Sequence, residues 1–257
     1  MGLVRYEVDA RIATITLNRP DKRNALNAAM VTELKKAFTK AATNDHAKVI
    51  VLEAEGDAFC AGADLAYLAE LQQNTYEENL ADSNHLKELF YQIYTHPKVV
   101  VAKIQGHAIA GGCGLATVCD FSFAADHAKF GYTEVRIGFI PAIVKVFLLR
   151  KIGEGKAKEL LLTGKLYDAI SAKNYGLVND VFSAEDLNDQ VTSFVNSLIE
   201  NNSGQSMTLT KQMIANVQEL SLEEGLNHAA EQNAKARATS DCQNGIAAFL
   251  NKEKLSW

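Results

Sequence analysis

Proline, tryptophan and paired cysteines are scarce in this chain of 257 residues, which holds three prolines, one tryptophan and four cysteines. With so few prolines and no low-complexity stretch, the sequence contains no recognisable flexible linker. The six histidines form no His-Glu-x-x-His motif, and no Cys-x-x-Cys pair occurs among Cys60, Cys113, Cys119 and Cys242. We therefore expect four reduced thiols and no metal site.

Long hydrophobic runs and an excess of basic residues are also missing. The longest apolar runs, such as residues 98–102, are too short to cross a bilayer. The N-terminal residues include Arg5 and Glu7 and lack the apolar core of an export signal. A net charge of −5 argues against nucleic acid as the main partner, because phosphate binding needs a basic surface. We expect a cytoplasmic protein without a membrane or nucleic-acid partner.

Strand and helix patterns alternate over the first two thirds of the chain. Alternating apolar residues over 4–8 and 11–17 predict a hairpin that turns at Asp9-Ala10. Helical spacing follows over 27–42, and the apolar run 48–54 is typical of a buried strand. The same alternation continues as a helix over 76–95, a strand over 98–104, a helix from 111 and a strand over 119–124. Such alternation indicates an α/β fold with parallel strands.

The last third of the chain has no strand pattern. Residues 184–199, 204–220 and 221–252 read as helices separated by short polar breaks. We therefore divide the chain into an α/β core over 1–183 and a helical region over 184–257. The apolar stripes of these helices either close over their own core or dock on a neighbouring subunit, and the sequence leaves both open.

Three segments carry the chemistry: residues 58–65, 106–116 and 130–141. The first two are small-residue turns between a strand and a helix, where backbone N–H groups stay unshielded and a helix N-terminus adds positive charge. Two such turns together can form an oxyanion hole, although each glycine turn alone is more often a packing feature. The glycines at 111, 112 and 114 fit neither the dinucleotide fingerprint nor a phosphate loop.

The third segment contains one carboxylate, Glu134, among apolar and glycine residues. A lone carboxylate is often a surface group or a salt-bridge partner, here to Arg136. An apolar setting would instead raise its pKa toward the range of a general acid/base. The residues alone support both readings.

In this order and at these separations, the three segments resemble the enoyl-CoA hydratase/isomerase (crotonase) family. Residues 18–27 look like the first CoA-binding loop of that family, and residues 59–65 look like its most recognisable motif. Residues 162–165 with 172–179, and 245–252, are similar to its later segments. The resemblance implies a spiral of ββα turns with a helical trimerisation region, assembly as a trimer or hexamer, and an acyl-CoA substrate with no other cofactor.

The resemblance also implies roles for individual residues. The oxyanion N–H groups would belong to Ala63 and Gly111, and Glu134 would move the proton. Ala61, Asp64 and Leu65 would lie near the adenine of CoA, and Arg19 and Arg23 would contact its phosphates. The remaining implied substrate contacts are Ala25, Gly112, Gly114 and Pro141. Lys252 and Lys254 would add positive charge, either from the same chain or from an adjacent subunit.

Two departures from the family pattern bear on the reaction. The best-known hydratases carry a first glutamate where this chain has Gly114, and the familiar Pro-Gly-Ala-Gly-Gly is replaced by Pro141-Ala-Ile-Val. Both stretches resemble bacterial methylglutaconyl-CoA hydratases, which favours hydration of a 2-enoyl-CoA, including a branched one such as methylglutaconyl-CoA. One alternative is an isomerase that converts 3-enoyl-CoA to 2-enoyl-CoA with Glu134 alone. A second is a non-catalytic or RNA-binding member of the family.

Overall fold

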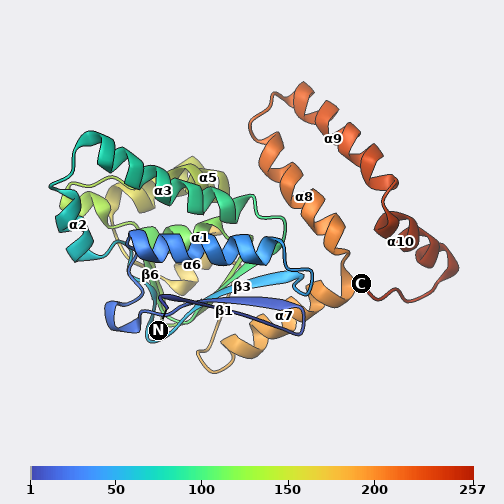
Figure 1. Ribbon diagram of the computed structural model, residues 1–257, viewed down its shortest axis with the longest axis horizontal. Helices are drawn as coiled ribbons and strands as arrows, with labels where there is room; N and C mark the ends of the chain where they lie inside the picture. Colours follow the sequence, from blue (N-terminus) through green and yellow to red (C-terminus); the bar gives the residue numbers. More distant parts are fainter. Residues whose placement is uncertain (1) are drawn as a thin grey trace.

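Two β-sheets form the centre of the molecule in the computed structural model, which describes residues 2–257 (Figure 1). The larger sheet has the order β1-β2-β3-β5-β7-β10 and is parallel except for the β1–β2 hairpin. Its strands are β1 (Val4–Asp9), β2 (Ile12–Leu17), β3 (Val49–Ala54), β5 (Val99–Ile104), β7 (Phe121–Ala125) and β10 (Asp180–Phe182). The smaller sheet has the order β4-β6-β8-β9. Its strands are β4 (Ala58–Cys60), β6 (His107–Ile109), β8 (Lys129–Gly131) and β9 (Tyr167–Asp168).

The chain winds between these sheets as a spiral. Three strands of the larger sheet are each followed in the chain by a strand of the smaller sheet: β3 by β4, β5 by β6, and β7 by β8. A helical segment follows each pair of strands before the next turn begins. These segments are α2 (Leu65–Leu71) with α3 (Tyr76–Tyr94), α4 (Gly111–Val118), and the 3-10 turn η2 (Glu134–Ile137) with α5 (Val144–Thr163). Because every turn repeats the same order, three strand-to-helix junctions follow parallel strands of the smaller sheet.

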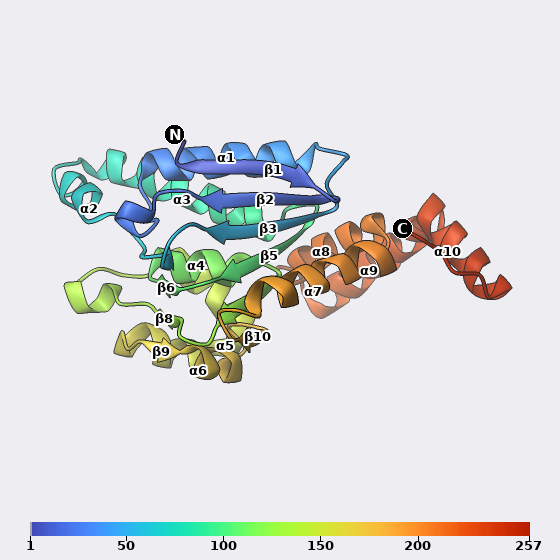
Figure 2. The ribbon, with the colours of Figure 1, turned by 90° about the horizontal axis from the view of Figure 1, so that it is seen from below.

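Apolar periodicity decides which helix faces are buried. Helix α1 (Ala28–Ala42) buries Met30, Leu34, Phe38 and Ala41 at the spacing expected for one face. Its first turn is capped by Asn27, whose side chain accepts a hydrogen bond from the Met30 N–H at 2.9 Å. Helices α1 and α3 lie side by side over the larger sheet (Figures 1 and 2).

Helix α7 (Leu187–Asn201) covers the opposite face of the larger sheet. Its buried residues Val191 and Val195 pack with Val51 and Val101 of strands β3 and β5. These strands are therefore buried on both faces, which explains their almost continuous apolar runs. The helices α6 (Ala169–Tyr175), α8 (Gly204–Val217), α9 (Leu222–Arg237) and α10 (Ser240–Asn251) complete the chain.

Helices α8, α9 and α10 extend away from the sheets (Figure 2). Leu222 and Phe249 are more than 80% exposed on them, at 82% and 83%. Across residues 2–257, no helix combines the length and the apolarity that a membrane crossing requires.

The fold differs from the sequence-based prediction in three places. The hairpin turns at Ala10-Arg11, both with positive φ, rather than at Asp9-Ala10. The helix predicted over 221–252 is interrupted before Ser240, where Thr239 caps α10. The smaller sheet was not predicted, because strands of two or three residues are too short to show alternation.

Candidate active site

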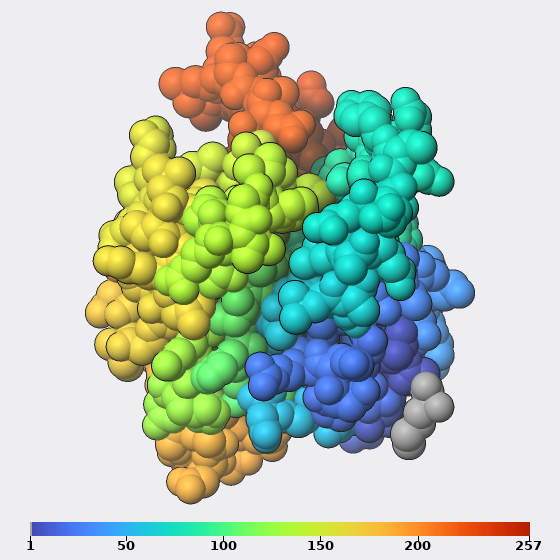
Figure 3. Space-filling model, turned by 90° about the vertical axis from the view of Figure 1, so that its left-hand side faces the viewer, coloured from blue at the N-terminus to red at the C-terminus, as the bar shows by residue number. Residues whose placement is uncertain are grey.

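A cavity of about 470 Å³ lies where the three segments meet. Its walls come from α2, α3, the turn after β6 and the segment that begins at η2. Figure 3 shows the side of the molecule on which α2 (teal) and the segment around η2 (yellow-green) approach each other. Most of its lining is apolar: Leu26, Val31, Leu65, Leu68, Leu71, Leu86, Ile137, Phe139, Ile140, Ile143 and Val144.

A β-bridge between Leu26 and Ala63 sets the direction of the first N–H group. Leu26 donates its N–H to the Gly62 carbonyl at 2.7 Å and accepts the Asp64 N–H at 2.9 Å. In this parallel bridge Leu26 bonds to backbone groups of Gly62 and Asp64, the two neighbours of Ala63, so the N–H of Ala63 itself points away from Leu26. Within the described chain this N–H makes no backbone hydrogen bond, and Ala63 lines the cavity.

The second N–H group belongs to Gly111, the first residue of α4. The first N–H groups of a helix lack partners within the helix, and the positive end of the helix dipole lies there. A Cβ atom added to Gly62 would lie 3.4 Å from the Gly111 nitrogen and 2.8 Å from the Ala110 Cβ. The two turns are therefore in direct contact, and Ala63 and Gly111 both line one cavity. Their role as oxyanion donors stays a prediction.

Ala110 holds the second turn in a strained conformation. Its φ of 50° and ψ of −122° lie outside the regions that residues with a side chain favour. Such strain costs about 1–3 kcal/mol and gathers at functional sites. The sequence analysis did not predict this conformation, because alanine ordinarily avoids positive φ.

Glu134 opens the η2 turn and lines the cavity. Burial raises the pKa of its carboxyl above the ordinary value. Its Oε2 atom is buried and has no hydrogen-bond partner among the described residues. Arg136, the alternative partner, is exposed and makes no ion pair in residues 2–257. The salt bridge between Glu134 and Arg136 is therefore absent from the described residues, and the general acid/base role of Glu134 stays a prediction.

Gly114 and Val144 occupy one site from two segments. A Cβ atom on Gly114 would lie 2.4 Å from Val144 Cγ1 and 3.1 Å from Phe90 Cε2. The two departures from the family pattern are therefore in contact. Val144, which stands where the familiar motif has glycine, fills the space beside Gly114, which stands where the family has its first glutamate. Glu134 and Asp82 are the acidic residues that line the cavity within the described chain.

This contact predicts that the first glutamate cannot be restored alone. Gly114→Glu overpacks a buried helix and buries a carboxylate, which should destabilise the protein by about 3 kcal/mol or more and lower activity. Adding Val144→Gly to Gly114→Glu should recover at least about 1 kcal/mol of the lost free energy of unfolding, because the two residues are in contact and their effects are coupled. Urea unfolding of both single variants and the double variant checks this, and additive free energies would contradict it.

The residues predicted to bind CoA are arranged around an ion pair. Arg19 Nη1 lies 2.6 Å from Asp64 Oδ2, and Arg19 also donates to the Ala25 carbonyl at 3.4 Å. Burial by itself would raise the pKa of Asp64, but the Arg19 guanidinium and backbone N–H groups bring it below its ordinary value. Arg23 is exposed, and its carbonyl accepts the Ala61 N–H at 3.0 Å. The phosphate contacts of Arg19 and Arg23 stay predictions.

Asn24, which the sequence analysis did not single out, holds this loop in place. It is fully buried, and its side chain donates to the carbonyls of Glu55 and Ala58, each at 2.8 Å. Its positive φ of 53° is one that asparagine tolerates. An asparagine inside a polar loop was the only sequence signal for this role.

The other predicted residues fall into three groups. Ala61, Leu65 and Pro141 line the cavity. Gly112 packs against β4 instead, because a Cβ atom there would lie 2.1 Å from the Cys60 carbonyl oxygen. The third group, Lys252 and Lys254, follows α10, at the far side of the molecule from α2 (Figure 1). A role at the site of an adjacent subunit stays a prediction for them.

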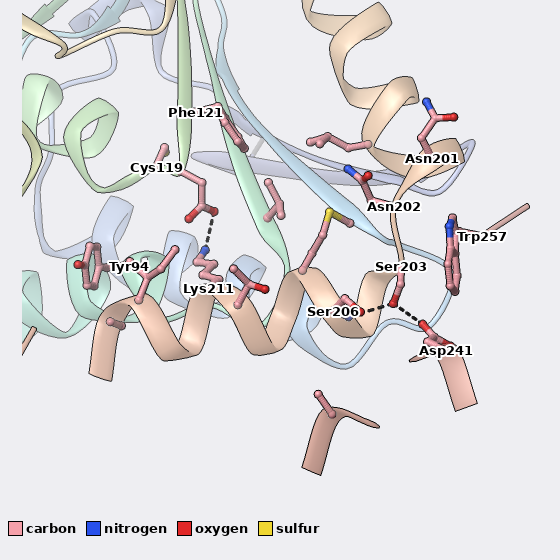
Figure 4. A pocket seen from close by; sticks show the side chains of 18 of the residues that line it. Tyr94, Cys119, Phe121, Asn201, Asn202, Ser203, Ser206, Lys211, Asp241 and Trp257 are labelled. Atoms are coloured by element: carbon pink, nitrogen blue, oxygen red, sulfur yellow. Dashed lines mark hydrogen bonds and ion pairs between the residues drawn. The ribbon is translucent and has the colours of Figure 1, made fainter. Parts of the chain in front are cut away.

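A larger hollow of about 860 Å³ lies at the opposite end of α4, beside α8 and α10 (Figure 4). Its two buried lysines have partners: Lys211 Nζ lies 2.7 Å from Asp120 Oδ2, and Lys151 donates to carbonyls at the end of α4 at 3.1–3.5 Å. Neither free N–H group nor Glu134 reaches it. Residues 2–257 contain no cluster of His, Cys, Asp or Glu that could hold a metal.

Comparison with known proteins agrees with this geometry. The family model described as "Enoyl-CoA hydratase/isomerase" matches residues 7–257. The chain belongs to this family. It is 40% identical over 241 residues to a Thermus thermophilus protein named for enoyl-CoA hydratase activity, covering 94% of this chain and 95% of that protein.

Two further relatives extend the match. The 2,3-dehydroadipyl-CoA hydratase of Escherichia coli is 33% identical over 244 residues, covering 94% of this chain and 92% of its own. The structure of an enoyl-CoA hydratase from Mycobacterium smegmatis aligns with a TM-score of 0.93 and 30% identity over 100% of this chain and 99% of that one. The predicted crotonase fold is confirmed.

Proposed function

We propose that this family member is an enoyl-CoA hydratase, which adds water across the 2,3 double bond of a 2-enoyl-CoA. The observation that carries the proposal is that two N–H groups without backbone partners, from Ala63 and Gly111, and the unpartnered Oε2 atom of Glu134 lie at one apolar cavity. The names of the relatives support hydration as the reaction.

The thioester carbonyl would accept hydrogen bonds from both N–H groups. As the oxygen of water bonds to C3, electrons move through the double bond to the carbonyl oxygen, and the enolate forms against these donors. Glu134 takes the proton that the water loses and delivers it to C2. One carboxylate thus suffices, because the proton taken from water is the proton delivered to C2. The hydroxyl group and this proton are then added to the same face of the double bond.

The substrate remains the finer part of the proposal. Similarity around Gly114 and over 133–144 to methylglutaconyl-CoA hydratases suggested a branched substrate with a distal carboxylate. Such a group needs a facing cation, and the described lining includes neither lysine nor arginine. Of the two nearby cations in the sequence, Arg136 and Lys145, both are exposed and neither lines the cavity.

Isomerisation is the second candidate, and the single catalytic carboxylate is the observation that favours it. Glu134 would remove a proton from C2 of a 3-enoyl-CoA and return it to C4, while the same N–H groups hold the dienolate. Both reactions use the same residues, so only the substrate distinguishes them.

Ultraviolet absorbance of the conjugated thioester tests the proposal. The purified protein should remove conjugation from a 2-enoyl-CoA, with straight-chain and methylglutaconyl substrates measured separately. A gain of conjugation from a 3-enoyl-CoA, without loss from any 2-enoyl-CoA, would establish the isomerase. No change with any substrate would favour the non-catalytic or RNA-binding alternative.

We also propose that α8, α9 and α10 pack against neighbouring chains of a trimer or hexamer. Their exposed apolar residues support this: Leu222, Leu226, Ile246, Phe249 and Leu250. Light scattering should give a mass of three or six chains, and Phe249→Asp should lower it. A wild-type monomer at micromolar concentration would contradict the assembly.

A further inference from the structure

One wall of the cavity carries a hydrogen-bonded pair that the proposed reaction does not use. Tyr67 of α2 donates its hydroxyl to Asp82 Oδ1 of α3, and both side chains line the cavity. Burial, followed by this hydrogen bond, raises the pKa of the Tyr67 hydroxyl, so tyrosine remains the donor and the carboxylate the acceptor.

Asp82 lies nearer the N-terminus of α3 than the residue of that helix that packs beside the second oxyanion turn. Phe90 of α3 packs beside Gly114, within one helical turn of Gly111. Asp82 precedes Phe90 by eight residues of the same helix, which corresponds to about 12 Å along its axis. Leu86 lines the cavity between these two positions. An acyl chain that leaves the thioester along α3 therefore runs toward Asp82.

No positive charge balances Asp82 within the cavity lining of the described chain. His85 lines the same wall, but both nitrogens of its ring face groups of α1 rather than Asp82. Lys35 Nζ, which can only donate, lies 3.3 Å from His85 Nδ1, and His85 Nε2 faces the Thr32 hydroxyl at 3.0 Å and the Ala28 carbonyl at 3.3 Å.

The Thr32 proton is already used, because that hydroxyl donates to the Ala28 carbonyl at 2.8 Å. The His85 ring is therefore held by Lys35, Thr32 and Ala28 of α1, and it makes no hydrogen bond to Asp82 among the described residues. Lys35 itself pairs with Glu88 at 2.5 Å and does not line the cavity. A carboxylate at this end would meet Asp82 without a facing cation.

We propose that Asp82 is a specificity-determining residue, which makes the cavity select 2-enoyl-CoA substrates with an uncharged, apolar tail and reject those that end in a carboxylate. This inference rests on the proposed hydratase function. The apolar side chains around the cavity accept a hydrocarbon tail, whereas a second carboxylate would face a like charge in a partly buried site. For two carboxylates about 8 Å apart and an effective dielectric constant of about 20, that repulsion corresponds to a roughly 30-fold lower kcat/KM for the substrate that carries the second carboxylate.

Two substrates of equal chain length test the inference. Wild-type protein should hydrate 2-hexenoyl-CoA with a kcat/KM about 30-fold above that for 2,3-dehydroadipyl-CoA, which differs by a terminal carboxylate. Asp82→Asn removes the charge and keeps an oxygen that accepts from Tyr67. It should raise kcat/KM for 2,3-dehydroadipyl-CoA and reduce the ratio to about threefold or less.

Two variants serve as controls. Glu77→Gln removes the same charge from an exposed position of α3 outside the cavity, and should leave the ratio unchanged. Tyr67→Phe removes the hydrogen bond but keeps the charge of Asp82, so the ratio should not fall. A wild-type ratio near one, or an unchanged ratio in Asp82→Asn, would overturn the inference.

Binding of the saturated thioesters separates this inference from the function on which it rests. Hexanoyl-CoA and adipyl-CoA cannot be hydrated, so calorimetry reports the charge preference of the cavity without turnover. If no 2-enoyl-CoA is hydrated, the proposed function fails. The affinity ratio of these two ligands in wild-type protein and Asp82→Asn still decides whether Asp82 selects against a carboxylate.

Discussion

Glu134→Gln should lower kcat for hydration of a 2-enoyl-CoA by about 10³-fold, within the range known for loss of a general acid/base. The amide has nearly the same shape, so the cavity keeps its walls and loses only the group that moves the proton. Affinity for a saturated acyl-CoA should change by less than about threefold. The measurement is steady-state kinetics by thioester absorbance, with titration of the saturated ligand beside it.

The pH dependence gives this prediction a second readout. Burial raises the pKa of Glu134, and the reaction needs the carboxylate form to accept a proton from water. Activity should therefore fall as the pH drops through this raised pKa, at a higher pH than an ordinary glutamate would give. Exposed Glu77→Gln should keep both the rate and the profile. More than a tenth of wild-type activity in Glu134→Gln would remove Glu134 from the mechanism.

Gly62→Ala should lower kcat by about 10²-fold or more, because it separates the two turns that supply the oxyanion donors. Gly62 has a φ of +88°, and an added Cβ would lie 2.8 Å from the Ala110 Cβ and 2.9 Å from the Ile109 carbonyl oxygen. One turn must move away from the other. The thioester oxygen would then lose good geometry to either the Ala63 or the Gly111 N–H.

Gly176→Ala is the matched control for this variant. Gly176 has a similar φ of +78°, and an added Cβ there meets nothing within 4 Å. Both variants should lose about 1–2 kcal/mol of stability from the backbone conformation alone. Only Gly62→Ala should lose further stability through crowding between the two turns, and only this variant should lose activity. Thermal unfolding and kinetics compare them. Equal losses of activity would show that crowding between the turns is not responsible.

Patterns within short segments were enough to predict much of the fold. The helical spacing of α1 and the apolar runs of β3 and β5 fixed their type and approximate bounds. The smaller sheet escaped prediction because its strands contain two or three residues and are defined by their partners. Interruption of 221–252 also escaped, since Thr239 resembles any surface threonine until its hydroxyl is seen to cap α10.

The site shows the same division between local and distant information. The sequence alone determined that two small-residue turns, one isolated glutamate and a glycine in place of the family's first glutamate are present. Each of these facts depends on residue type and spacing, which are local properties of the chain.

The tertiary structure decided what these residues face. It joined the Ala63 and Gly111 turns, placed Val144 in the space beside Gly114, and paired Arg19 with Asp64. It also brought Tyr67 and Asp82 together across two helices. Such contacts depend on the positions of segments 15 to 48 residues apart in this chain, where packing rather than local propensity determines which side chains meet.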